Sequence, residues 1–182
     1  MQLFGNNFVL GNLSWSSLYG SDLFNVFLSD SDLVGTDLSC CDIAQCDFEN
    51  ASLEHAEFHN SSIHNCKFHR ANMEFSSFTD SRCKGANFSE VCLSSAKFNR
   101  AEFINSDFTD SDLRNADLTN AIFQNCNFKN AQLKGAILKG CNFKEVNLTG
   151  VNFKDVDLTG CLLPSDFDKN GSLSLPNTNE NS

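Results

Sequence analysis

Residues 111–130 read SDLRNADLTNAIFQNCNFKN, and this stretch decides the fold. A leucine or a phenylalanine stands at every fifth position in it. The same step of five meets an apolar residue at 33 consecutive positions, from Leu3 to Leu163, and ends before Pro164. Apolar residues make up only 41% of the chain, so chance does not produce such a run. A period of five fits neither an α-helix nor a simple strand alternation, and it favours a square coil.

The other positions of the repeat are also constrained. We call the apolar position the centre. The residue two before it is usually small, and the residue just before it is often Asp or Asn. The two residues after it are mostly polar. The small positions include Ala51, Ala56, Cys66, Ala71, Ala86, Ala96, Ala101, Ala116, Ala121, Cys126, Ala131 and Ala136.

Segments such as Ala116-Asp117-Leu118-Thr119-Asn120 resemble the A(D/N)LxX signature of the pentapeptide-repeat family. The resemblance covers residues 1–163 without an insertion. It implies an all-β fold, a right-handed quadrilateral parallel β-helix with four pentapeptides per coil and about eight coils. The centre and the small residue then point inward, and neighbouring coils lie about 4.8 Å apart. Residues 164–182 are expected to form a polar, flexible C-terminal tail.

A coil of four pentapeptides also predicts that residues twenty apart stack on one another. One such column is almost entirely aromatic. It reads Phe8, Leu28, Phe48, Phe68, Phe88, Phe108, Phe128 and Leu148. This uniformity supports twenty residues per coil independently of the family signature.

Most of the nine cysteines fall at inward positions. Cys41, Cys46, Cys66, Cys126, Cys141 and Cys161 occupy the small position, and Cys83 occupies a centre. A free cysteine behaves as a small buried hydrophobe, so we expect reduced thiols in the core. Cys40 is expected to point outward.

No constellation predicts catalysis or a cofactor. The histidines His55, His59, His64 and His69 are interpreted as surface residues, because the last three fall on successive sides of the coil. Asp166, Asp168 and Asn170 match the first half of a calcium loop, but the position that requires a bidentate Glu is Asn177. The chain is therefore expected to be neither an enzyme nor a metalloprotein.

Charge is uneven along the chain. The net charge is −10, which disfavours direct binding to nucleic acid. Residues 1–66 contain no Lys or Arg. Their nine acidic residues are Asp22, Asp30, Asp32, Asp37, Asp42, Asp47, Glu49, Glu54 and Glu57. In the late repeats, Lys129, Lys134, Lys139, Lys144 and Lys154 share one outward position. The chain shows no secretory signal and no membrane-spanning stretch, so a cytoplasmic location is expected.

Large apolar residues also occupy outward positions in the first two coils. They include Phe4, Trp15, Tyr19, Phe24 and Phe27. A concentrated apolar patch usually marks an interface, and aromatic residues often dominate binding. Two interpretations stay open: these side chains cap the end of the coil, or they bind a protein partner or a second copy of the chain.

Two functions follow. The first is a non-enzymatic protein-interaction scaffold or regulator. The second is implied by pentapeptides such as Cys126-Asn127-Phe128, which resemble the quinolone-resistance members of the family. These members mimic DNA and bind DNA gyrase or topoisomerase IV. Residues 1–66 carry the charge of about 16 Å of B-DNA. The chain lacks the loops and the C-terminal dimerisation helix of these proteins, and its acids are spread over all four sides.

Overall fold

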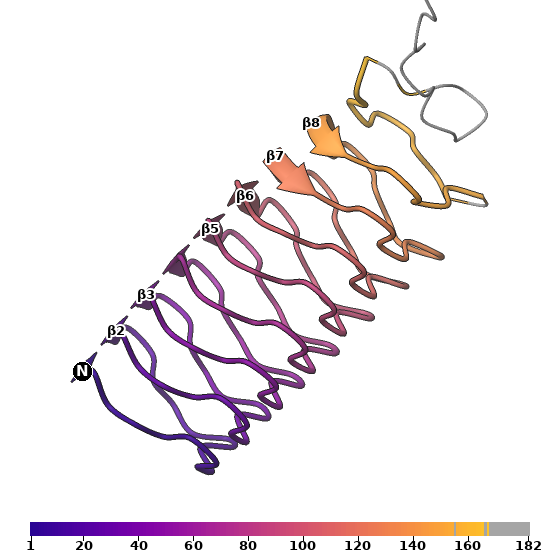
Figure 1. The fold of residues 1–182 in the computed structure, drawn as a ribbon. Coiled ribbons are helices and arrows are strands. Elements are labelled where there is room, and N and C mark those ends of the chain that lie inside the picture. The colour runs from indigo at the N-terminus through magenta and orange to yellow at the C-terminus, as the bar shows by residue number, and fades with distance from the viewer. Residues whose placement is uncertain (155, 166, 168–182) are drawn as a thin grey trace, which may run out of the picture.

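The computed structural model describes residues 1–154, 156–165 and 167 and shows a right-handed parallel β-helix (Figure 1). One parallel sheet runs along it, with strands in the order β1 to β8. The strands are β1 (Gln2–Phe4), β2 (Asp22–Phe24), β3 (Asp42–Ala44), β4 (Ser62–His64), β5 (Arg82–Lys84), β6 (Glu102–Ile104), β7 (Ile122–Asn127) and β8 (Asn142–Asn147).

Strand partners differ by twenty residues from β1 to β7, as when Leu3 pairs with Leu23. The other three sides repeat this register through isolated bridges, among them Asn12 with Asp32 and Asp112 with Gln132. The predicted coil of twenty residues and the predicted fold class are therefore confirmed. We number the sides in chain order, so that the first coil has residues 1–5, 6–10, 11–15 and 16–20 as its first to fourth sides.

The corners explain why Asn and Gly end so many pentapeptides. At one corner the carbonyl of Leu113 accepts a hydrogen bond from the N–H of Ala116 at 3.1 Å. Asn115, between them, has a φ of 59°. A left-handed residue at the third position defines a type II turn, and Gly and Asn adopt this conformation with the least strain.

In many pentapeptides an Asp or Asn just before the centre accepts a hydrogen bond from the backbone of the same side. The Oδ1 of Asp117 accepts hydrogen bonds from the backbone N–H of Thr119 at 2.9 Å and from its hydroxyl at 2.6 Å. Asp and Asn side chains are suited to this bond because they reach the N–H two residues further along the chain. The Asp and Asn preference in the repeat therefore has a local hydrogen-bonding cause.

The interior is packed with stacked aromatic rings. Ring centroids in the column of Phe48, Phe68, Phe88, Phe108 and Phe128 lie 4.6–5.0 Å apart. This is the column predicted from the twenty-residue step, and each of its rings is fully buried. Offset stacking adds to the free energy gained by burying apolar area. The stack therefore ties each coil to its neighbours.

The last coil carries an added contact. Phe167 packs edge-on against Phe153, with ring centroids 5.3 Å apart. The candidate calcium residues Asp166, Asp168 and Asn170 lie outside the described residues, as does most of the predicted tail.

Candidate interaction surfaces

The five aromatic residues that the sequence singled out are all exposed, but they do not form one surface. Phe4 and Phe24 lie beside each other at the end of the first side, with ring centroids 6.5 Å apart and ring planes tilted by 60°. Phe27 follows at the start of the second side and is also exposed. We call these three residues the phenylalanine patch. Trp15 lies at the end of the third side, so it belongs to another surface of the coil.

A second aromatic surface follows one corner of the rod. We call Trp15, His55 and Phe75 the aromatic corner, because they share one repeat position at the end of the third side. The imidazole of His55 stacks on the ring of Phe75, with centroids 5.0 Å apart and planes 9° from parallel. The indole of Trp15 fills the space that a side chain on Gly35 would occupy. Trp15 is 73% exposed and Phe75 is 50% exposed.

The backbone gives no reason for aromatic residues here. Trp15 and Phe75 both have a φ of 58°, and His55 has a φ of 59°. Bulky residues seldom adopt this left-handed conformation, and strain of this kind often accompanies function. The aromatic corner therefore retains costly residues at positions where Asn or Gly fits best.

An open hollow of about 360 Å³ lies beside the aromatic corner. Besides the corner residues it is lined by Glu57, His59, Ser77 and Lys97 on the fourth side, and by Gly35. The sequence interpretation missed Phe75 and did not bring His55 and His59 together. The twenty-residue step could have predicted the aromatic corner, because steps of twenty from Trp15 reach Gly35, His55 and Phe75.

Tyr19 lies on the fourth side and is exposed. A hydrogen bond with the thiol of Cys40 raises the pKa of Tyr19. This contact joins the only tyrosine of the chain to Cys40, the one cysteine that is exposed rather than buried or partly buried.

The nine acidic residues of the early coils are distributed over all four sides. Some of them lie beside another acidic residue in the next coil. The backbone of Asp22 pairs with that of Asp42, and the backbone of Asp37 pairs with that of Glu57. The carboxylate of Asp47 is 3.7 Å from the ammonium of Lys67. The surface of the early coils is therefore acidic all round, and no single acidic stripe forms.

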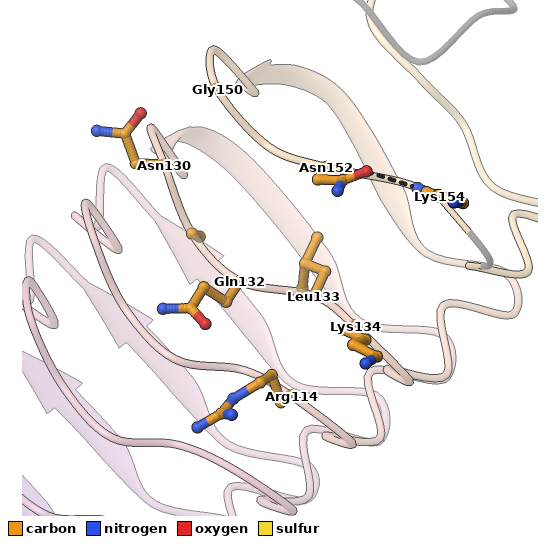
Figure 2. A pocket seen from close by; sticks show the side chains of 9 residues that line it. Arg114, Asn130, Gln132, Leu133, Lys134, Gly150, Asn152 and Lys154 are labelled. Carbon is orange, nitrogen blue, oxygen red and sulfur yellow. Dashed lines mark hydrogen bonds between the residues drawn. The ribbon is translucent and has the colours of Figure 1, made fainter.

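The late coils present a basic surface with a shallow depression. A hollow of about 490 Å³ lies on the third side, between the cations Arg114, Lys134 and Lys154 (Figure 2). Gln132 and Asn152 add amide groups to its lining. The Oδ1 of Asn152 accepts a hydrogen bond from the backbone N–H of Lys154 at 2.9 Å, and Figure 2 marks this bond.

The cysteines are free thiols, and most are buried as the sequence predicts. Burial raises the pKa of Cys83, and it raises the pKa of Cys126 to about 11. Raised values make these thiols poor nucleophiles. Cys92, which the sequence interpretation left out, is partly exposed on the third side.

Among the residues that the structure describes, no group of three or more His, Cys, Asp and Glu side chains is arranged to hold a metal ion. No helix with the length and apolarity of a membrane span occurs among the same residues.

The repeat, the coil and the packed core together define a class of protein. A model of pentapeptide repeats (8 copies) matches residues 12–50, 31–70 and 56–94, and a model of the pentapeptide repeat region matches residues 76–153. The chain belongs to the pentapeptide-repeat family. No curated protein matches the sequence.

Solved structures with the same fold include a plasmid-mediated fluoroquinolone resistance protein. A trypsin-treated form of this protein, QnrB1, matches with a TM-score of 0.52 and 18% identity, over 91% of this chain and 84% of QnrB1. HetL, involved in heterocyst differentiation regulation in the cyanobacterium Nostoc sp. strain PCC 7120, matches with 21% identity and a TM-score of 0.33, over 95% and 89% of the two chains.

Proposed function

We propose that this chain is a non-enzymatic scaffold that binds a protein partner through exposed aromatic side chains of its early coils. The observation that carries the proposal is the aromatic corner, in which Trp15, His55 and Phe75 occupy strained positions and remain exposed. Aromatic side chains often dominate protein interfaces, because they bury a large area at a small cost in conformational entropy. The phenylalanine patch offers a second anchor.

Affinity capture with matched variants tests this proposal. The wild-type chain and a Trp15→Ser, Phe75→Ser variant are immobilised and exposed to lysate, and the bound proteins are quantified. The control is Ile122→Ser with Ile137→Ser, which removes two exposed apolar residues from later coils. The proposal expects one partner that the wild type and the control bind and the corner variant does not. Equal binding to all three chains contradicts it.

A second candidate function is DNA mimicry directed at a type II topoisomerase. The acidic early coils favour it, and QnrB1, a fluoroquinolone resistance protein, shares the fold. The test is a gyrase supercoiling assay with and without a fluoroquinolone. Inhibition, or protection from the drug, supports this function, and no effect at a large excess of protein over gyrase contradicts it.

Neutral variants show whether the acids cause any effect on gyrase. Asp42→Asn, Glu49→Gln and Glu57→Gln remove charge from three sides. Asp47 is left intact, because its Oδ1 accepts the N–H of Glu49 at 3.0 Å and supports the backbone. DNA mimicry expects these substitutions to weaken the effect together. An unchanged effect would mean that the acidic surface is not what gyrase binds.

A further inference from the structure

The third side separates its charges along the rod. We call the residues just after its centres the charge column. In chain order they are Ser14, Val34, Glu54, Glu74, Ser94, Arg114, Lys134 and Lys154. Two acids precede Ser94 and three bases follow it, so the sign of charge changes at the fifth coil.

The corresponding columns of the other sides carry fewer charges. The second side has one acid and one lysine, Glu49 and Lys129, and the fourth side has only Lys139. The first side has Lys84 and Lys144 and no acid. Glu49 and Lys129 make one acid–base pair at equal distances from the fifth coil, whereas the third side is the only one of these described columns with two such pairs, Glu74 with Arg114 and Glu54 with Lys134.

We propose that a second copy of this chain binds face to face on the third side, with the two rods antiparallel. The two-fold axis lies in the interface, parallel to residues 91–95. It places Glu74 opposite Arg114 of the second copy and Glu54 opposite Lys134 of the second copy. Symmetry repeats both pairs, so four ion pairs form. The same patch serves both subunits, as a two-fold interface requires.

The side chains around the charge column are compatible with this pairing. The axis places Asn72 opposite Asp112 and Ser52 opposite Gln132 of the second copy, which are pairs that can hydrogen-bond. No like charges meet among these pairs. At the corner, the ring of His55 lies opposite Gly135, which has no side chain to obstruct it.

The charged groups are already oriented within one copy. The hydroxyl of Ser94 donates a hydrogen bond to the carboxylate of Glu74. The carboxylate of Asp112 holds the guanidinium of Arg114 at 2.5 Å, and a guanidinium retains further N–H donors for a second carboxylate. The hollow beside Lys134 gives the carboxylate of Glu54 from the second copy room to enter (Figure 2).

The size of the face indicates a weak complex. Eight coils at about 4.8 Å, with a side about 10 Å wide, give on the order of 400 Å² per copy. Stable interfaces usually bury about 800 Å² per partner. The ion pairs are open to solvent and are screened by salt. We therefore expect a dimer that is strongly dependent on ionic strength.

Analytical ultracentrifugation with charge-reversed variants tests the proposal. The wild type is studied from about 1 μM to about 1 mM, at about 50 mM and about 500 mM NaCl. We expect a dimer whose dissociation constant is larger by about tenfold or more at the higher salt. Glu54→Lys with Glu74→Lys, and Arg114→Glu with Lys134→Glu, should each be monomeric. Mixed in equal amounts, the two variants should form a heterodimer.

Two further variants keep the test decisive. Glu49→Lys with Glu57→Lys makes the same change in net charge on the second and fourth sides, and it should leave the dimer intact. Ser94→Arg places two cations together at the axis and should abolish the dimer, and circular dichroism checks that each variant is folded. A monomeric wild type at low salt overturns the proposal. A dimer that withstands the reversal of Glu54 and Glu74 also overturns it.

Discussion

The indole of Trp15 lies over Gly35 in the next coil, in the volume that a Cβ on Gly35 would need. The φ of Gly35 is +63°, so glycine is favoured there for two reasons, conformation and space. The same contact fixes the direction of the indole along the rod, toward His55 and Phe75. The shape of the aromatic corner therefore depends on one glycine.

Gly35→Ala is predicted to displace the indole of Trp15. The new methyl overlaps the Cε3 and Cζ3 atoms of the ring, which must rotate away. Because Trp15 is the only tryptophan, its emission maximum and its quenching by iodide report the movement directly. Gly20→Ala is the matched control, since Gly20 has a φ of +62° and nothing near its Cβ position. Both substitutions should cost about 1–2 kcal/mol of stability, but only Gly35→Ala should change the fluorescence.

Phe88→Ala is predicted to lower the free energy of unfolding by about 3–5 kcal/mol. Phe88 is fully buried and stacks on Phe68 and Phe108 at 4.8 and 5.0 Å, so its removal leaves a cavity between two coils. Phe8→Ala, at a half-buried centre in the first coil, should cost distinctly less. Urea denaturation followed by circular dichroism measures both. Similar losses would show that the stack does not couple the coils as described.

One thiol is predicted to react much faster than the others in the native chain. Cys40 is exposed, whereas burial raises the pKa of Cys41, Cys83 and Cys126. A thiol reagent such as DTNB should label Cys40 first and should reach all nine cysteines only after denaturation. Cys40→Ser should remove the fast phase. If the fast phase persists in that variant, another thiol is accessible.

Acid is predicted to weaken the fold partly through Asp112. The guanidinium of Arg114 holds the pKa of Asp112 below its usual range. A depressed folded-state pKa contributes stability above the unfolded pKa of about 3.9, and this stability is lost as the pH falls through the folded value. Asp112→Asn should reduce the loss of stability between about pH 6 and pH 2 by about 0.5–1 kcal/mol, since the pair is partly exposed.

Thermal unfolding at several pH values measures this effect. Asp42→Asn serves as the control, because Asp42 is in no ion pair among the residues that the structure describes. If Asp112→Asn and the wild type lose the same stability in acid, the pair with Arg114 contributes nothing to folding.

The repeat alone was sufficient to predict the coil. The step of five located the buried centres such as Leu118, and the step of twenty predicted the stack that includes Phe88. These predictions succeed because each inward side chain can pack only between the equivalent side chains of the neighbouring coils. The left-handed corner at Asn115 follows equally from local conformation.

Outward side chains are not constrained in this way, and the tertiary structure decides their contacts. Three arginines illustrate this, because each forms its ion pair in a different direction along the rod. Arg70 bonds Glu90 in the following coil, Arg100 bonds Asp80 in the preceding coil, and Arg114 bonds Asp112 within its own side. The repeat places each arginine on a side, but its rotamer depends on which neighbours are within reach. The sequence by itself therefore determined the coil and its core, whereas the contacts among outward side chains were decided only by the folded arrangement, because these flexible side chains have several neighbours within reach.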